Sequence, residues 1–387
     1  MFDVENPSVS NNKETEKPQV ILAALETDNS RYFEHSIEEM NSLIEACDME
    51  VHAVLTQKLP HPEPGTYLGR GKAEELAQLA KNMGVQYCIF EDNLTPVQLK
   101  NLNRTVGVEI WDRTTLILEI FSRRAKTREA RLQVESAYLQ YMLPRLSGMW
   151  QHLGRQSGSS GSRSNKGIGE TQLELDRRQI NKRLASLSRE LDTISRTRET
   201  QRQGRSRSDV PHVALVGYTN AGKSTLMNAL LQKSGADEQK QVFEKDMLFA
   251  TLDTSVRRIS TQDRRDFLLS DTVGFIENLP HGLIKAFRST LEEAAHADLI
   301  LVVLDASDEF HEEHKSVTQK TLKELSAQNI PRIYIYNKSD LMPEMEGRIP
   351  VIKPEEIWIS AKSGTGLDEL LDMITDTLYK SNRTLKL

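Results

Sequence analysis

The sequence feature that most constrains this chain is a glycine-bounded loop between a strand pattern and a helix pattern. Residues 217–224 read Gly-Tyr-Thr-Asn-Ala-Gly-Lys-Ser, residues 213–216 are all apolar, and residues 225–231 open an apolar helical pattern. Such a loop surrounds phosphate oxygens with backbone N–H groups, and the helix N-terminus adds favourable partial charge. The spacing and its context predict a nucleoside triphosphate site, against the alternative of a chance glycine-rich turn.

Several groups around this loop are predicted to handle the phosphates and a magnesium ion. Lys223 reaches the β- and γ-phosphates, and the Ser224 hydroxyl ligates the metal. Thr251, in Phe-Ala-Thr-Leu-Asp, closes on the metal when a γ-phosphate is present, although a plain loop threonine is the alternative. Asp271, in Asp-Thr-Val-Gly after a predicted strand, holds the metal through a water, and the Gly274 amide senses the γ-phosphate.

A second set of residues predicts which base is bound. Residues 337–340 read Asn-Lys-Ser-Asp after an apolar strand pattern. The Asp340 carboxylate can accept two N–H groups from guanine, and adenine offers no such pair. Asn337 is expected to brace the loop, Lys338 to cover the purine face, and the Ala361 amide of Ser-Ala-Lys to read the guanine oxygen. The order of these motifs predicts GTP rather than ATP.

The residue after Gly274 is Phe275, where many efficient GTPases place a glutamine that orients the attacking water. Because a phenyl ring neither donates nor accepts a hydrogen bond, the catalytic group is unknown and slow intrinsic hydrolysis is expected. The predicted GTP-binding residues are Gly217, Tyr218, Thr219, Asn220, Ala221, Gly222, Lys223, Ser224, Thr225, Phe249, Ala250, Thr251, Asp271, Gly274, Asn337, Lys338, Asp340, Ser360, Ala361 and Lys362. The predicted magnesium ligands are Ser224, Thr251 and, through a water, Asp271.

The chain before this GTP-binding domain, which we assign to residues 206–387, predicts further parts. Residues 1–17 are rich in Asn, Ser, Lys and Glu, which predicts a disordered tail. Residues 18–111 alternate strand and helix patterns, which predicts a small, mostly parallel α/β domain. Its Gly-Arg-Gly-Lys segment at residues 69–72 lacks the phosphate-loop spacing and is either a tight helix start or an anion site.

Residues 112–205 predict a long helical hairpin. Residues 114–143 contain no glycine or proline, and like residues 171–203 they repeat apolar side chains at steps near three and four. Two helices of roughly 30 residues would each be ~45 Å long, and neither can bury its apolar stripe alone. We therefore expect an antiparallel pair, with the glycine- and serine-rich residues 142–170 as its tip loop.

The hairpin is basic within an acidic chain. The net charge is −6, whereas residues 113–209 hold 20 Lys and Arg against 10 Asp and Glu. Guanidinium groups suit phosphates and aromatic rings suit stacking on bases, so the tip is expected to contact RNA. A solvated charged surface and a simple connector are the alternatives. The predicted RNA contacts are Arg145, Trp150, His152, Arg155, Arg163 and Lys166.

Composition excludes several other classes. No apolar run reaches the length of a membrane span, and the acidic N-terminus does not resemble a signal peptide. Cys47 and Cys88 have neither metal nor redox spacing and are expected to pack as small apolar side chains. We expect a cytoplasmic monomer.

Short motifs are distributed over all parts of the chain. They are Gly-Arg-Gly-Lys at 69–72, Asp-Arg-Thr at 112–114, Ala-Arg-Leu-Gln-Val-Glu at 130–135, Tyr-Met-Leu-Pro-Arg-Leu at 141–146, Gly-Glu-Thr-Gln-Leu-Glu at 169–174, Asp-Arg-Arg at 176–178, Asp-Thr-Val-Gly-Phe-Ile at 271–276 and Leu-Pro at 279–280. With the nucleotide motifs they resemble the HflX family of ribosome-associated GTPases over about residues 18–380. One departure is Gly-Ile-Gly-Glu at residues 167–170, where the family usually has Gly-Pro-Gly-Glu.

The resemblance implies a Ras-like P-loop GTPase domain and an N-terminal α/β domain extended by the hairpin. It implies a GTPase that binds the large ribosomal subunit and helps to dissociate stalled ribosomes under stress, with the hairpin tip on ribosomal RNA. It also implies ATP binding by the N-terminal region. The alternatives are an assembly GTPase acting on immature large subunits, a signalling switch whose hairpin grips a protein, and an RNA-remodelling enzyme that uses ATP.

Overall fold

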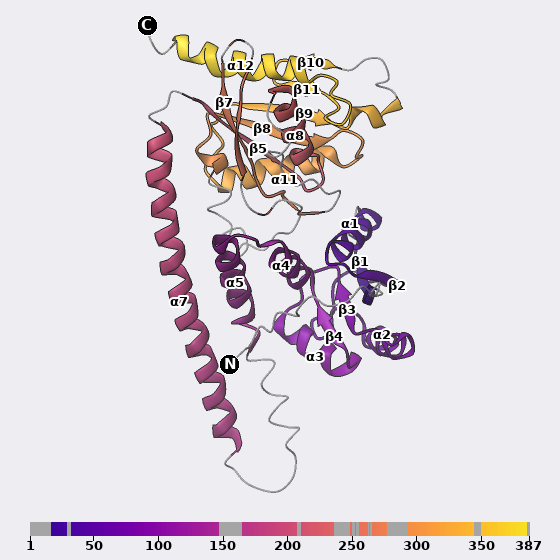
Figure 1. Ribbon diagram of the computed structural model, residues 1–387. Coiled ribbons are helices and arrows are strands. Elements are labelled where there is room, and N and C mark those ends of the chain that lie inside the picture. The colour runs from indigo at the N-terminus through magenta and orange to yellow at the C-terminus, as the bar shows by residue number, and fades with distance from the viewer. Residues whose placement is uncertain are drawn as a thin grey trace, which may run out of the picture. The chain divides into compact units, whose positions relative to one another are not determined.

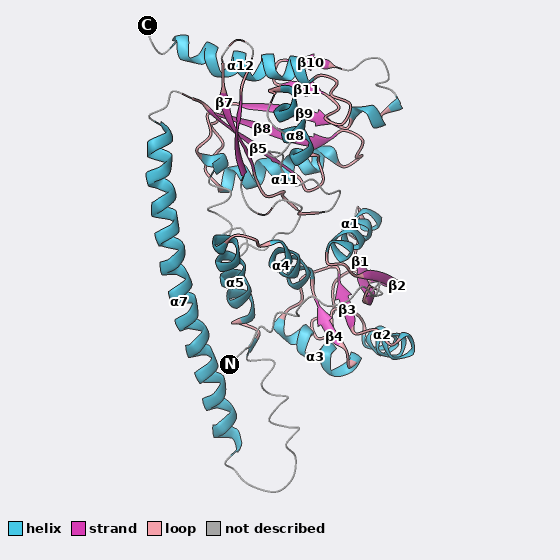
Figure 2. Ribbon diagram, in the orientation of Figure 1, coloured by secondary structure: helices cyan, strands magenta, loops and turns pink. Residues whose placement is uncertain are grey.

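The computed structural model (Figure 1) describes residues 17–28, 32–146, 165–206, 210–235, 248–249, 252, 255–261, 263, 265–276, 293–343 and 350–384. The chain divides into two compact units, residues 1–113 and residues 114–387. Figure 2 shows strands and helices in both units, with long helices preceding the sheet of the second. These features confirm the predicted fold class: a parallel-sheet α/β domain, a helical region and a P-loop domain.

The first unit is built on a four-stranded sheet of order β2-β1-β3-β4, in which every neighbouring pair is parallel. Parallel neighbours need crossover connections, and helices supply them. Thr95 and Gln98 form a capping box at the start of α3, and Gly84 and Gly107 end α2 and α3 in the left-handed conformation. The elements are β1 (Gln19–Glu26), α1 (Phe33–Ala46), β2 (Glu50–Lys58), α2 (Arg70–Met83), β3 (Tyr87–Phe90), α3 (Pro96–Val106) and β4 (Glu109–Trp111).

The helical segment that follows differs from its predicted form. It contains α4 (Arg113–Arg124), α5 (Arg128–Met142) and α7 (Asn165–Ser206). The prediction of one continuous helix over residues 114–143 is wrong, because a break separates α4 from α5. Thr127 caps α5 by accepting a hydrogen bond from the Ala130 N–H, and such a cap favours a new helix start. Residues 165–170 belong to α7 rather than to the tip loop.

Helices α5 and α7 are held together by ion pairs. Arg183 contacts both carboxylate oxygens of Glu135 at 2.6 and 2.7 Å, and Arg198 pairs with Glu129 at 2.6 Å. The reversed order of these partners shows that the helices are antiparallel. With 42 and 15 residues, α7 and α5 are ~63 and ~22 Å long, so much of α7 extends beyond its partner. Among the described helices, none combines the length and apolar character that crossing a membrane requires.

The rest of the second unit is a seven-stranded sheet of order β10-β11-β9-β8-β5-β7-β6. The pairs at the two edges, β10 with β11 and β6 with β7, are antiparallel, and the central pairs are parallel. Apolar side chains of the central strands pack on α8 and α12 from one face and on α11 from the other. The elements are β5 (His212–Gly217), α8 (Lys223–Lys233), β6 (Ser255–Ile259), β7 (Phe267–Asp271), β8 (Leu299–Asp305), α11 (His311–Glu324), β9 (Arg332–Asn337), η2 (Ser339–Leu341), β10 (Val351–Lys353), β11 (Glu356–Trp358) and α12 (Leu367–Thr384).

Candidate functional site

The residues predicted to bind the nucleotide follow the carboxyl ends of neighbouring parallel strands. Residues 217–224 begin at the last residue of β5, Asp271 ends β7, Asn337 ends β9, and Ser360 lies two residues beyond β11. The chain places β7 on one side of β5 and β8 on the other, so the strand order reverses at β5. In open parallel sheets ligands bind outside the carboxyl ends of the strands at such a point. The fold therefore gathers the phosphate and base motifs at one edge.

Two glycines let backbone segments approach more closely than a side chain would permit. A Cβ on Gly217 would lie 2.1 Å from the carbonyl oxygen of Val303 on β8. A Cβ on Gly222 would lie 2.3 Å from Nδ2 of Asn337 on β9. Gly222 also has a φ of 88°, a left-handed conformation that glycine adopts without strain. The conformation of the phosphate loop therefore requires glycine at positions 217 and 222.

Lys223 begins α8 and is buried within the loop. Its Nζ donates to the carbonyl oxygens of Gly217 at 3.2 Å and Tyr218 at 2.7 Å. Burial lowers the pKa of Lys223 to about 8, although the Asp271 carboxylate acts in the opposite direction. The Tyr218 ring stacks on His314 at 3.7 Å between centroids, so this residue faces α11 and offers the site only its backbone. A bound triphosphate would supply the negative charge that the buried ammonium needs.

The Ser224 hydroxyl donates a hydrogen bond of 2.7 Å to Oδ2 of Asp271. Asp271 is fully buried at the end of β7, whereas Ser224 is half-buried in the first turn of α8. Strand and helix thus place two oxygen atoms side by side next to the phosphate loop, although they are 47 residues apart in sequence.

Phe275 holds the phosphate loop through its main chain. Its N–H donates to Gly217 O at 3.0 Å, and its carbonyl accepts from the Thr219 N–H at 2.8 Å. The ring is 1% exposed and packs in the apolar cluster between the sheet and α11. A side chain buried in that cluster does not reach a water at the phosphate site. The group that orients the attacking water therefore stays unassigned at this position.

Asn337 connects the phosphate loop to the base loops. Its Nδ2 donates to Ala221 O at 3.0 Å, and its Oδ1 accepts from the Ala361 N–H at 2.9 Å. The contact between the Ala361 amide and the guanine oxygen stays a prediction, and Asn337 braces the loop that carries this amide. Asp340 lies exposed in the 3₁₀ turn η2, where its carboxylate is open to a base.

Lys338 is positioned by an aspartate that the motifs did not identify. Its Nζ lies 2.7 Å from Oδ2 of Asp305, and its backbone has a φ of 60°. The other carboxylate oxygen of Asp305 accepts from the N–H and the hydroxyl of Ser307, at 3.0 and 2.6 Å. Asp305 ends β8 in register with Asn337. The sequence feature that could have identified Asp305 is its place at the end of a predicted strand, beside the strand that leads into the base motif.

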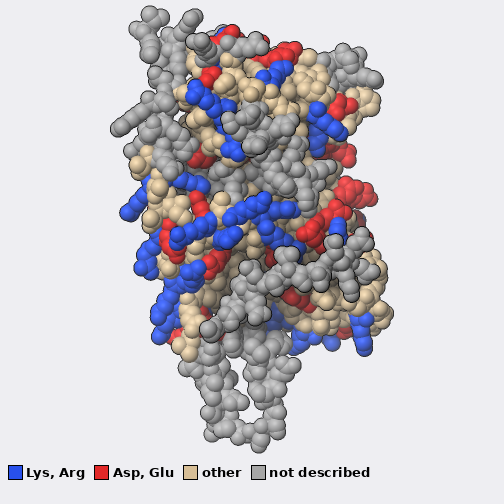
Figure 3. All heavy atoms as spheres, viewed as in Figure 1, with Lys and Arg blue, Asp and Glu red and all other residues tan. Residues whose placement is uncertain are grey.

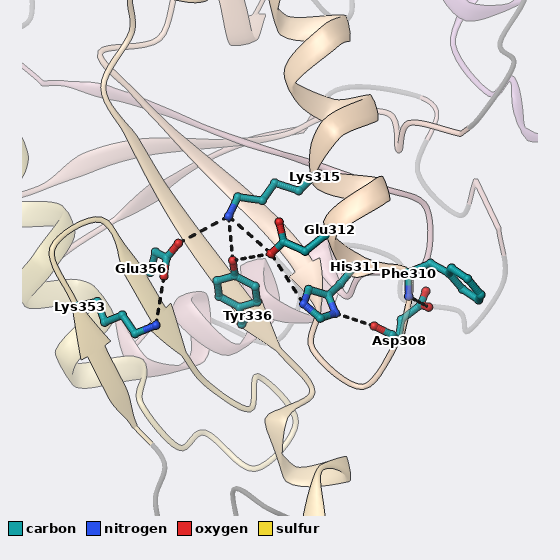
Figure 4. A network of polar contacts seen from close by, with 8 residues as sticks. All are labelled: Asp308, Phe310, His311, Glu312, Lys315, Tyr336, Lys353 and Glu356. Carbon is teal, nitrogen blue, oxygen red and sulfur yellow. Dashed lines mark hydrogen bonds and ion pairs between the residues drawn. The ribbon is translucent and has the colours of Figure 1, made fainter. Parts of the chain in front are cut away.

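A polar network also anchors the end of β9 (Figure 4). Lys315 of α11 donates to the Tyr336 hydroxyl at 2.9 Å, and this hydroxyl donates to Oε1 of Glu312 at 3.3 Å. The Tyr336 ring stacks on Trp358 of β11 at 4.3 Å, and burial raises the pKa of its hydroxyl. Because Tyr336 directly precedes Asn337, the network fixes the strand end that carries the base motif. A cavity of about 270 Å³ there is lined by Ala306, His311, Glu312, Lys315, Tyr336, Met342, Lys353, Glu356 and Trp358.

Comparison with known proteins decides the family. Three family models match consecutive parts of the chain: a GTP-binding GTPase N-terminal region at 34–122, a GTP-binding GTPase middle region at 124–205 and a 50S ribosome-binding GTPase at 212–338. GTPase HflX of Caldanaerobacter subterraneus subsp. tengcongensis is 43% identical over 96% of this chain and 83% of its own length. This chain belongs to the HflX family. GTPase HflX of Escherichia coli is 41% identical over 88% of this chain and 79% of its own length.

HflX proteins are GTP hydrolases, and this chain has the P-loop domain that carries their activity. The predicted family and GTP-hydrolase activity are therefore confirmed. The crystal structure of SsGBP in complex with GDP matches 95% of this chain and 99% of its own, with a TM-score of 0.50 and 24% sequence identity. At that identity the likeness establishes the fold alone.

The remaining residues predicted to bind the nucleotide differ in exposure and in the groups that they contact. Asn220 is exposed at the loop with a φ of 60°, Thr225 is half-buried in the first turn of α8, and Lys362 is exposed. Phe249 is 2% exposed and packs edge-to-face on Phe121 at 4.7 Å, so its ring serves the core rather than the nucleotide. Ala250 and Thr251 lie outside the described residues.

Arg145 is the only predicted RNA contact whose side chain is described, and it is not an exposed arginine. It is 8% exposed, its guanidinium lies 3.5 Å from the centre of the Tyr141 ring, and Nη1 donates to Tyr141 O at 3.2 Å. The prediction that Arg145 offers its charge to RNA is therefore corrected, because the group is used locally. Lys166 lies in α7 with its side chain outside the described part, and Trp150, His152, Arg155 and Arg163 lie outside it entirely.

Proposed function

We propose that this HflX-family GTPase binds the large ribosomal subunit in a nucleotide-controlled way and promotes the dissociation of stalled ribosomes. The observation that carries the proposal is a short covalent link between the basic helix and the nucleotide site. Helix α7 ends at Ser206, and β5, which leads directly into the phosphate loop, begins at His212. A long rigid helix joined to that strand is suited to couple the nucleotide state to a distant contact.

The residues of the site fit a magnesium ion. Mg²⁺ prefers oxygen ligands, and Ser224 Oγ and Asp271 Oδ2 lie 2.7 Å apart beside the phosphate loop. Thr251 remains the third predicted ligand. The bound ion would neutralise charge on the β- and γ-phosphates. Lys223 and the loop amides would hold the same phosphates, and Asp340 would accept the N–H groups of guanine.

The charge of α7 supports an RNA partner. Arg177, Arg178 and Lys182 are exposed on its first half, and Lys and Arg side chains follow this helix along the left of Figure 3. Contacts between such groups and phosphates release counterions, so binding to RNA weakens steeply with salt. A shallow salt dependence and resistance to ribonuclease would instead indicate a hairpin that grips a protein.

The direct test is co-sedimentation with purified large subunits. With a non-hydrolysable GTP analogue the full chain is expected to pellet with the subunits, and with GDP it is expected to remain largely free. Lys223→Ala is the control, since it should pellet equally little with either nucleotide. Equal sedimentation of the unaltered chain with the analogue and with GDP would refute nucleotide control.

A second experiment separates splitting from assembly. Adding the chain and GTP to intact ribosomes should release free subunits, detected on a sucrose gradient. Binding confined to immature large subunits, with intact ribosomes unchanged, would indicate the assembly role. ATPase activity retained after Lys223→Ala would show that ATP is used elsewhere, in keeping with the ATP binding predicted for the N-terminal region.

A further inference from the structure

Thr219, the third residue of the phosphate loop, has a buried hydroxyl that forms no hydrogen bond with the described part of the protein. The residue is 6% exposed, and its Oγ1 has no hydrogen-bond partner among the residues that the structure describes. Other buried threonines of this domain do have partners: Thr272 donates to Leu215 O at 2.7 Å, and Thr318 donates to His314 O at 2.8 Å. Buried polar groups are nearly always paired, so the Thr219 hydroxyl indicates a partner that binds from outside.

The position of Thr219 indicates which partner this is. A Cβ built on Gly274 would lie 2.8 Å from Thr219 Cγ2, 2.9 Å from Thr219 Cα and 2.9 Å from Lys223 Nζ. The Gly274 amide and the Lys223 ammonium are the groups predicted to contact the γ-phosphate. The Thr219 backbone is held beside them by its hydrogen bond to Phe275 O. The Thr219 side chain therefore lies at the end of the loop where the γ-phosphate reacts.

Hydrolysis needs a polar group at this end of the site, and Phe275 does not supply one. Water must be oriented for attack, and the residue after Gly274 is Phe275, whose ring is buried in the core. A threonine hydroxyl both donates and accepts hydrogen bonds. Among the described side chains of the phosphate loop, Thr219 combines a buried hydroxyl, the absence of a protein partner and proximity to Gly274.

We propose that the Thr219 hydroxyl is a catalytic group of GTP hydrolysis, contacting the attacking water and the γ-phosphate. The water oxygen forms a bond to the γ-phosphorus, while the bond from that phosphorus to the bridging oxygen breaks and leaves its electron pair on GDP. The water proton ends on the released phosphate. Thr219 is unchanged by the reaction: its oxygen accepts a hydrogen bond from the water, and its O–H donates a hydrogen bond to a γ-phosphate oxygen without losing the proton.

Three variants of the full chain test this role without ribosomes, so the result is independent of the proposed ribosomal function. Thr219→Val replaces the hydroxyl with a methyl of similar size, and Thr219→Ser keeps the hydroxyl. Thr318→Val is the matched control, because it removes a buried hydroxyl that is paired within α11. Single-turnover hydrolysis with protein in excess over GTP is measured together with the dissociation constant for GTP.

Thr219→Val is expected to lower the single-turnover rate about 10- to 100-fold, since one positioned donor contributes on that order or more, with the GTP dissociation constant changed less than about threefold. Thr219→Ser and Thr318→Val should stay within about threefold of the unaltered rate. Hydrolysis by Thr219→Val at the unaltered rate would overturn the proposal. An equal loss in Thr219→Ser would also overturn it, because shape rather than the hydroxyl would then matter.

A second readout covers the case in which the unaltered rate is too slow for a further loss to be measured. GDP with magnesium and aluminium fluoride mimics the transferring phosphate, so its binding reports groups that act in the transition state. The added fluoride complex should tighten GDP binding to the unaltered chain and to Thr219→Ser, and this gain should be lost in Thr219→Val. An equal gain in the unaltered chain, Thr219→Ser and Thr219→Val would refute the assignment.

Discussion

Two helices of this chain, α2 and α8, begin beside a glycine and a lysine, but only α8 forms a phosphate loop. Gly69 caps α2 with a φ of −57°, and its N–H donates to Gln57 at 2.9 Å. Lys72 turns to Glu75 of its own helix, also at 2.9 Å. Gly222 caps α8 in the left-handed conformation, and Lys223 is buried against loop carbonyls.

The difference shows what a glycine and a lysine need in order to form an anion site. Five residues separate Gly217 from Lys223, enough for the loop to fold back over the helix N-terminus. At α2 the first N–H is already satisfied by a side chain, and the ammonium is already paired. The open choice between a helix start and an anion site at residues 69–72 is therefore resolved in favour of a helix start.

The largest expected effect contrasts the two lysines. Lys223→Ala should weaken GTP binding by about 100-fold or more, since a buried ammonium on the phosphates forms strong charge-assisted bonds. Lys72→Ala should leave the affinity unchanged, because its ammonium pairs with Glu75 of its own helix. Equilibrium binding of a fluorescent GTP analogue measures both. A loss of affinity in Lys72→Ala would mean that α2 contributes to nucleotide binding after all.

The next effect contrasts the two capping glycines. Gly222→Ala should destabilise the GTPase domain by about 1–3 kcal/mol and weaken GTP binding, because it combines a left-handed residue with a clash against Asn337. Gly69→Ala should cost about 1 kcal/mol or less, since its Cβ would meet only the movable end of Gln57 at 3.0 Å. Urea unfolding measures both, and equal losses would contradict the comparison.

A smaller effect concerns Lys338. Asp305→Asn removes the charge 2.7 Å from its Nζ and should weaken GTP and GDP binding about 3- to 10-fold, the equivalent of one modest ion pair. The loss should be the same for ITP, because Lys338 covers the face of the purine and not its edge. Ser307→Ala, which removes one hydrogen bond to Asp305, should have a weaker effect in the same direction. Unchanged affinities in Asp305→Asn would exclude this positioning role.

The smallest effect concerns Glu91, a buried carboxyl group of the first unit. Burial raises the pKa of Glu91, which follows β3, above its ordinary value of 4.5. The folded state then holds a proton that the unfolded state has released, so stability falls as pH rises from 4.5 through the folded pKa. Glu91→Gln should remove this dependence and so make the first unit more stable than the unaltered chain at pH 7. Urea unfolding at pH 5 and pH 7 measures it, and an unchanged pH dependence would contradict it.

Much of this protein could be predicted from sequence because the decisive patterns are local. The phosphate loop needs only glycines and a lysine at fixed spacing between a strand and a helix. The central strand β8 is an uninterrupted apolar run, as a parallel strand covered on both faces requires. The short edge strands β6 and β10 were missed, since three to five partly exposed residues carry no clear period.

What only the tertiary structure decided depends on residues that are distant in sequence. Asn337 accepts from the Ala361 amide, Asp305 pairs with the Lys338 ammonium, and the buried Thr219 hydroxyl has no hydrogen-bond partner among the described residues. Hydrogen bonds and burial at these positions arise when strands far apart in the chain become neighbours, and spacing along the sequence carries no record of that.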